Sequence, residues 1–389
     1  MERQAREAVA GGIVSRVQLV QLPVAETAAG GLSDDDRDQT VIKPPSDPSK
    51  CARLMSLARV SPEIELAAVA SLAQHTGSSA LVIAELSGDF ASLGRLQRPG
   101  RSLAPRELRR LTGGRSTRYG DGVVSLTALA PSAQAWLSEP GPLSGPRLLN
   151  RLVRGLLAGL ARLGLAASYP GRDFVVANGR RIACVSLARE ASGVLLFQAV
   201  LGVGSRYTTA EREPSWPGLP AAPEPTWLER ERGAATEFAP ISAALATGFA
   251  ERFALELDFA PLSADEERAL AAITLLPVVD AELEGLCSAG ALATPIGELE
   301  AHVALDGGGR FARVRLRGDW IAAQPDLIAL EAALVGELPA SARVRELCAD
   351  WLSRPAALVI GLTDTAQIVD ALAQSARAYS LQPSSSRSS

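Results

Sequence analysis

The feature that most restricts the fold of this chain is a β-hairpin expected at residues 174–186. The strand-forming runs 174–177 and 180–186 flank the pair Asn178-Gly179. A two-residue type I′ turn requires a positive φ at both central positions, which Asn and Gly adopt most readily. The chain therefore has to contain an antiparallel sheet, against which its apolar helices can pack.

Helix and strand patterns are mixed along the rest of the chain. Ser61-Pro62-Glu63 is a helix-start signal. Residues 147–163 place eight Leu and Val side chains on one helical face, and Gly164 follows as a typical C′ cap. Short apolar strands are expected at 80–85 and 123–126. This mixture predicts an α+β fold built on a mixed sheet.

Shifts in composition divide the chain into four parts. Residues 1–54 are rich in Gly, Ala, Asp and Pro and are predicted to be a disordered leader, and the Ser-rich residues 379–389 a disordered tail. We expect a catalytic-type domain at 55–290 and a small α+β accessory domain at 293–378. The Pro-rich stretch 211–235 is predicted to be an exposed loop.

Composition excludes several kinds of chemistry. The two histidines, His75 and His302, lack the spacing of a zinc site, and we expect no metal-binding residues. The two lysines, Lys43 and Lys50, lie in the leader, so the folded body has neither a lysine nucleophile nor a P-loop lysine. The cysteines at 51, 184, 287 and 348 have no metal-ligand spacing and are interpreted as free thiols.

Hydropathy and charge restrict the location and the partners. No apolar run reaches the ~18 residues that a membrane helix needs. The N-terminus lacks a secretory core, so we expect a cytoplasmic protein. A net charge of −4 does not favour general nucleic-acid binding.

A basic stretch carries the strongest functional signal. Between Arg95 and Arg118 the chain has eight arginines and one acid, Glu107, and residues 109–115 read Arg-Arg-Leu-Thr-Gly-Gly-Arg. Adjacent glycines let backbone N–H groups approach an anion. Each guanidinium adds charge-assisted hydrogen bonds of about 1.5–3 kcal/mol. The pattern predicts a phosphate or adenylate cradle; a solvated basic loop and a nucleic-acid site, with Tyr119 as its single aromatic, are the alternatives.

Several motifs together resemble the lipoate–protein ligase A family of the biotin/lipoate protein ligase superfamily. Residues 110–115, running on to Tyr119-Gly120, are similar to its signature loop, and residues 91–97 to its strand ending in Leu-Gly-Arg-x-Gln. Residues 169–173 and 179–183 resemble its hairpin, and residues 318–320 its accessory domain. The likeness covers about residues 60–375 in the same order, which is more specific than one glycine loop.

The resemblance implies activation of lipoate or octanoate with ATP and Mg²⁺ to an acyl-adenylate, followed by acyl transfer to a lysine of a carrier domain. A carboxylate that attacks phosphate is already ionised, so a histidine base is not required. The resemblance places Arg181 at the family's hairpin lysine and offers Leu93 and Leu96 as tunnel lining. It assigns nucleotide and substrate binding to Arg110, Thr112, Gly113, Gly114, Arg115, Tyr119, Gly120, Arg172, Asp173 and Arg180.

The chain also departs from this pattern. Arginine at 181 keeps the charge of the lysine but not its compact geometry, Tyr119 replaces the loop histidine, and Cys184 stands where many relatives have glycine. Two other functions therefore stay open. One is a cysteine-dependent octanoyl or lipoyl transferase that uses Cys184, and the other is a non-catalytic relative that binds lipoyl groups or lipoylated domains.

Overall fold

The computed structural model describes residues 18–19, 50–74, 78–100, 104–137, 141–207, 223–259, 268, 270, 275–276, 278 and 280–381. Most of the predicted leader, much of the Pro-rich stretch and most of the predicted tail lie outside these residues, as does His75. Strand β2 begins at Cys51, inside the stretch predicted as leader. Helix α5, Leu228–Arg232, lies within the stretch predicted as an exposed loop, and Leu228 is buried.

Nine strands of the described chain form one mixed sheet. Their order is β1-β2-β3-β7-β11-β10-β9-β8, with β12 also beside β2. The pairs β2–β3 and β2–β12 are parallel, and the other neighbours are antiparallel. This architecture confirms the predicted α+β mixed-sheet fold. The strands are β1 Gln18–Leu19, β2 Cys51–Val60, β3 Ser79–Leu86, β7 Val123–Ala130, β8 Ala167–Ser168, β9 Phe174–Ala177, β10 Arg180–Arg189, β11 Leu195–Gly202 and β12 Glu256–Phe259.

The expected hairpin is formed by β9 and β10. Asn178 has φ 50° and Gly179 has φ 74°, as the type I′ turn requires. Arg180 lies opposite Ala177, and the register shifts between Arg181 and Ala183. Such a bulge re-aims the side chains that follow it.

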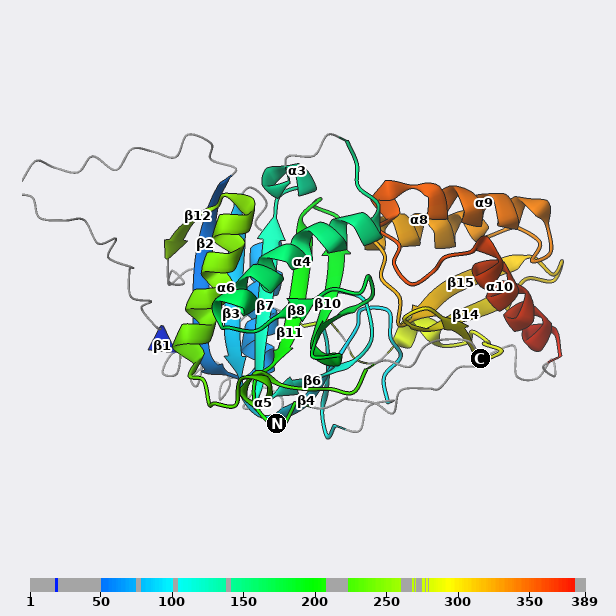
Figure 1. Ribbon diagram of the computed structural model, residues 1–389. Helices are drawn as coiled ribbons and strands as arrows, with labels where there is room; N and C mark the ends of the chain where they lie inside the picture. Colours follow the sequence, from blue (N-terminus) through cyan, green and yellow to red (C-terminus); the bar gives the residue numbers. More distant parts are fainter. Residues whose placement is uncertain are drawn as a thin grey trace, which may run out of the picture.

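Helices α4 (Gly145–Arg162) and α6 (Phe238–Phe253) cover one face of the sheet (Figure 1). They approach closely because glycines lie at their crossing: a Cβ at Gly159 would come within 2.8 Å of the Leu245 Cα. The short helix α3, Ala133–Trp136, packs its Trp136 ring against Phe249 and Phe253 of α6. Leu126 of β7 points to this face, and its neighbours Ser125 and Thr127 point to the other.

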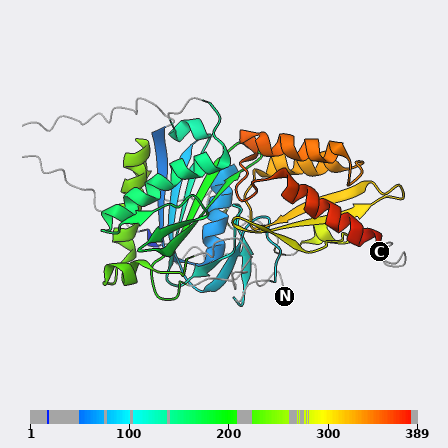
Figure 2. The same cartoon turned by 45° about the vertical axis from the view of Figure 1, so that its right-hand side comes forward.

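The other face carries helix α2 (Pro62–Gln74) and a small three-stranded sheet, the blue helix and cyan strands of Figure 2. The small sheet has the order β5-β4-β6. Its strands are β4 Asp89–Leu93, β5 Glu107–Arg109 and β6 Thr117–Gly120. The basic loop joins β5 to β6, so the fold places it over the same face of the large sheet as α2.

A second unit lies beside β10 (Figure 1). Its three-stranded sheet has the order β13-β14-β15. The strands are β13 Ala291–Thr294, β14 Gly297–Leu305 and β15 Phe311–Gly318, and the helices are η2 Ala281–Leu283, α8 Gln324–Leu334, α9 Ala342–Ser353, η3 Pro355–Ala357 and α10 Thr365–Ser380. The predicted boundaries at 290 and 293 stay a prediction. None of the described helices has the length and apolarity needed to cross a membrane.

Candidate functional site

The two glycines of the basic loop pack closely against other backbone segments. The Gly113 N–H donates to the Leu187 carbonyl oxygen of β10, and the Gly114 N–H to the Trp320 carbonyl oxygen of the second unit, each at 3.2 Å. Gly114 has φ 85°, and a Cβ at Gly113 would come within 3.0 Å of the Ile321 Cα. Both N–H groups are therefore occupied by protein carbonyls, which differs from the predicted phosphate cradle.

Arg110 braces the loop from inside. Its guanidinium donates to the Thr112 hydroxyl at 3.0 Å. It also donates to the carbonyl oxygens of Ser92, Gly113 and Arg115 at 2.8, 2.6 and 2.8 Å. Burial lowers the pKa of Arg110 to about 10, so the side chain stays charged at neutral pH. A fixed positive charge thus lies beneath the glycine pair.

An ion pair with two contacts joins the loop to the hairpin. Arg115 Nε lies 2.7 Å from Asp173 Oδ2, and Arg115 Nη2 lies 3.2 Å from Asp173 Oδ1. Two parallel contacts of this kind are stronger and more directional than a single one. Neighbouring arginines are engaged elsewhere: Arg172 stacks over the Phe174 ring at 5.1 Å, and Arg180 pairs with Glu231 at 3.6 Å.

The hairpin adds a buried arginine and a thiol. The backbone N–H of Arg181 donates to the Glu224 carbonyl oxygen, and the backbone carbonyl of Arg181 accepts from the Thr226 N–H, both at 2.8 Å. Cys184 Sγ lies 3.6 Å from the Tyr207 hydroxyl. Burial raises the pKa of Tyr207, and the charges of Arg181 and Arg115 oppose that shift. These four side chains therefore share one electrostatic environment.

The cavity between the loop and the hairpin, called the loop–hairpin cavity below, is very small. It measures about 10 Å³, room for about one water molecule. The predicted site residues Arg110, Gly114, Arg115, Asp173 and Cys184 line it, together with Thr117, Val185, Ser186 and Val200. The described residues that line it do not include the other seven predicted residues, which are Thr112, Gly113, Tyr119, Gly120, Arg172, Arg180 and Arg181. The structure thus brings five of the predicted residues together around one small cavity.

A buried hydrogen-bond network fills the region behind this cavity. The Tyr119 hydroxyl donates to Glu65 at 2.6 Å and accepts from Gln198 Nε2 at 3.1 Å. The Thr112 hydroxyl donates to Gln198 Oε1 at 2.7 Å and accepts from the Ser186 hydroxyl at 2.8 Å. Tyr119, expected at a ligand, is instead buried at the centre of this network, while Gly120 packs against the Gly88 backbone.

Glu65 is the member of this network that sequence reasoning missed. Hydrogen bonds from Tyr119, Ser125 and Thr127 lower its pKa, but burial outweighs them and raises it. The sequence pattern could have indicated this buried acid, because Glu65 lies three and four residues before Ala68 and Val69 on the buried face of α2. An acid on an apolar helical face has to find polar partners inside the protein.

The described residues do not assemble a metal site of their own. In the described ranges, no three His, Cys, Asp or Glu side chains come together as metal ligands. Mg²⁺ is usually held by one or two carboxylates together with substrate phosphates. Asp173 is the one carboxylate among the described residues that line the small cavity, and it pairs with Arg115.

Comparison with known proteins identifies the fold. No family model matches the sequence, and no curated protein matches it. P. falciparum LipL1 in complex with lipoate shares 10% identity, with 83% of this chain and 98% of that chain covered at a TM-score of 0.52. This likeness shows that the two chains share a fold, in agreement with the fold that the motifs predicted.

Two further structures match a smaller part of this chain, each with a lower TM-score. A bi-partite lipoate protein ligase with its E2 lipoyl domain from Thermoplasma acidophilum shares 14% identity, covering 57% of this chain and 90% of its own at a TM-score of 0.43. The biotin protein ligase from Leishmania major in complex with biotin shares 14%, covering 69% and 97% at a TM-score of 0.33.

Proposed function

We propose that this chain is a lipoate–protein ligase-like protein, which activates lipoate or octanoate with ATP and transfers the acyl group to a lysine of a carrier domain. The observation that carries the proposal is the charge around the loop–hairpin cavity. Arg110 and Arg115 line it, and Arg181 lies in the same environment, whereas the described lining contains one carboxylate, Asp173. A buried excess of guanidinium charge suits a phosphate-bearing ligand.

These residues would act by charge and position. The substrate carboxylate attacks the α-phosphate of ATP, and pyrophosphate leaves; guanidinium groups stabilise the negative charge that develops there. The carrier lysine then attacks the acyl carbon, AMP leaves, and the amine proton passes to solvent. Arg110, whose N–H groups bond to the loop itself, would favour the phosphate through its buried charge, and Arg181 would contact the adenylate in place of the lysine.

Ligand entry requires the site to open. An acyl-adenylate is far larger than a space of about 10 Å³. The group that has to move is Arg115, which would exchange Asp173 for the phosphate of the ligand. We assign phosphate and acyl binding to these residues; Mg²⁺ would be held mainly by the phosphates of ATP, as is usual for this ion.

Mass spectrometry of a carrier domain tests the proposal. The domain is incubated with the full chain, octanoate or lipoate, ATP and magnesium, and an ATP-dependent gain of one acyl mass is expected. Arg115→Ala should abolish the gain. The control is Arg118→Ala, which should keep the gain. Arg118 lies on β6, is more exposed than Arg115, and pairs with Asp89 of β4 at 2.5 Å. An acyl gain that is identical without ATP would contradict the ligase.

A cysteine-dependent transferase is the second candidate, because Cys184 lines the same cavity and contacts Tyr207. Its thiolate would attack an acyl thioester donor, release the donor thiol and pass the acyl group to the carrier lysine. Acyl transfer would then need a thioester donor but no ATP, and Cys184→Ser would abolish it. The ligase is expected to tolerate that substitution.

A non-catalytic relative is the third candidate, because the N–H groups of Gly113 and Gly114 are already bonded to protein carbonyl oxygens. Such a protein would bind lipoyl groups or a lipoylated domain without modifying a carrier. Titration calorimetry with lipoylated and unmodified carrier domains separates this function from the other two. Binding of the lipoylated form, together with no acyl gain from either donor, would support it.

A further inference from the structure

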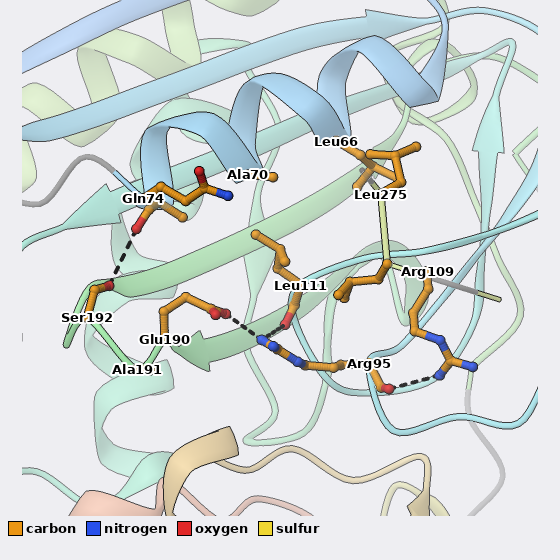
Figure 3. Close-up of a pocket in the computed structure, with 12 residues that line it drawn as sticks. Leu66, Ala70, Gln74, Arg95, Arg109, Leu111, Glu190, Ala191, Ser192 and Leu275 are labelled. Carbon is orange, nitrogen blue, oxygen red and sulfur yellow. Dashed lines mark hydrogen bonds and ion pairs between the residues drawn. The ribbon is translucent and has the colours of Figure 1, made fainter. Parts of the chain in front are cut away.

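A second and much larger cavity lies on the other side of the basic loop (Figure 3). Its volume is about 410 Å³, within the range of small-molecule sites, about 300–1,000 Å³. Helix α2 forms one wall and the turn between β10 and β11 another. The apolar part of its lining consists of Leu66, Ala70, Ala73, Leu111, Ala191, Leu275 and Leu276.

The charged groups of this cavity are paired. Arg95 forms an ion pair with Glu190, and its Nη1 also donates to the Leu111 carbonyl oxygen at 3.4 Å. Arg109 pairs with Asp280 at 2.8 Å and donates to the carbonyl oxygens of Arg95 and Gln97 at 2.8 and 2.6 Å. Each lining arginine therefore has a carboxylate partner, in contrast to the excess of positive charge at the loop–hairpin cavity.

The Arg95–Glu190 pair offers two kinds of hydrogen-bonding group side by side. Both side chains stay partly accessible, at 14% and 19% exposure. Arg95 supplies N–H donors, and Glu190 supplies carboxylate acceptors. A ligand carboxylate here would be repelled by Glu190, and a ligand ammonium would be repelled by Arg95. A neutral carboxamide has both an acceptor and a donor and meets neither repulsion.

We propose that this cavity is a binding site for an uncharged carboxamide with an aliphatic tail. The tail would lie against the leucine and alanine wall of α2 and the loop, where burial of apolar surface stabilises it. The amide would lie at the Arg95–Glu190 pair. The inference stands on this cavity and does not require the transfer reaction proposed above.

Three probes of equal chain length test the proposal by titration calorimetry on the full chain: octanamide, octanoate and octylamine. We expect octanamide to bind at least about tenfold more tightly than either charged probe, because burying an unbalanced charge is costly. Equal affinities for the three probes, or tighter binding of octanoate, would overturn the proposal.

Two substitutions locate the site. Ala70→Phe fills the cavity from α2 and should remove octanamide binding, whereas Ala161→Phe on the exposed side of α4 should not. Glu190→Gln leaves Arg95 without its carboxylate and should reverse the order of affinities in favour of octanoate. If Ala70→Phe does not fold, the reversal by Glu190→Gln decides the question on its own, and an unchanged order rejects the proposal.

One further variant separates this inference from the proposed function. Arg115→Ala should abolish acyl transfer but keep octanamide binding, since Arg115 is not among the described lining residues of the larger cavity. Loss of octanamide binding in Arg115→Ala, with binding kept in Ala70→Phe, would place the probe at the loop–hairpin cavity and reject the second site.

Discussion

The buried carboxyl of Glu65 provides a test of the interior network through the substitution Glu65→Gln. Burial raises the pKa of Glu65 above its ordinary value. A carboxyl whose pKa is higher in the folded chain than in the unfolded chain binds its proton more tightly when folded. Its contribution to stability is therefore complete at a pH below the pKa that Glu65 has in the unfolded chain. That contribution is lost as the pH rises through the pKa that Glu65 has in the folded chain.

The size of the effect follows from this linkage. Between the unfolded and the folded pKa of Glu65, the free energy of unfolding of the wild type should fall relative to the variant by up to about 1.4 kcal/mol per pH unit. A glutamine does not titrate in this range. Its shape is close to that of the protonated acid, with one oxygen acceptor and an N–H donor near Tyr119.

Urea unfolding followed by circular dichroism, from about pH 5 to about pH 8, measures this difference. The free energy of unfolding of Glu65→Gln should increase relative to that of the wild type as the pH rises. The matched control is Glu63→Gln on the same helix, where the side chain is 36% exposed and 3.9 Å from Arg106. Parallel stability curves for Glu65→Gln and the wild type would refute a raised pKa at Glu65.

Two further predictions concern the packing and the charge of the basic loop. Gly94→Ala should lower stability by about 1–3 kcal/mol, because a Cβ at Gly94 would overlap the Gly114 carbonyl oxygen; thermal unfolding should show no such loss for Gly307→Ala, where the space is open. Asp173→Asn should cost about 1.5–3 kcal/mol in urea unfolding by weakening the contacts to Arg115. The same variant should bind AMP more tightly in calorimetry, and unchanged AMP affinity would argue against an anion site there.

The glycine pair serves packing between the two units of this chain. In this chain the Gly114 N–H is bonded to Trp320 of the second unit. The Gly318 N–H donates to the Leu96 carbonyl at 2.9 Å, and Gln97 Nε2 donates to Asp319 at 2.5 Å. The loop is thus an attachment point for the second unit, and any ligand that enters beneath it has to compete with these contacts.

The sequence by itself determined the local structure and the fold. The Asn178-Gly179 turn depends on the φ preferences of two residues, and the apolar face of α4 depends on a period of 3.6 residues. Both are properties of short segments and can be read without knowing the rest of the chain. The order of motifs over 60–375 predicted the biotin/lipoate ligase fold for the same reason, since each motif is local and their order is fixed along the chain.

Only the tertiary structure decided what the candidate residues contact. Arg110 and Tyr119 were expected at a ligand, but partners far away in the sequence, such as Glu65 and Gln198, surround Tyr119, and neighbouring carbonyls surround Arg110. A guanidinium or hydroxyl bonds to whichever acceptor lies nearest in space, and that depends on how α2, β7, β10 and β11 pack. The two cavities have the same origin, because an empty volume belongs to no single segment of the chain.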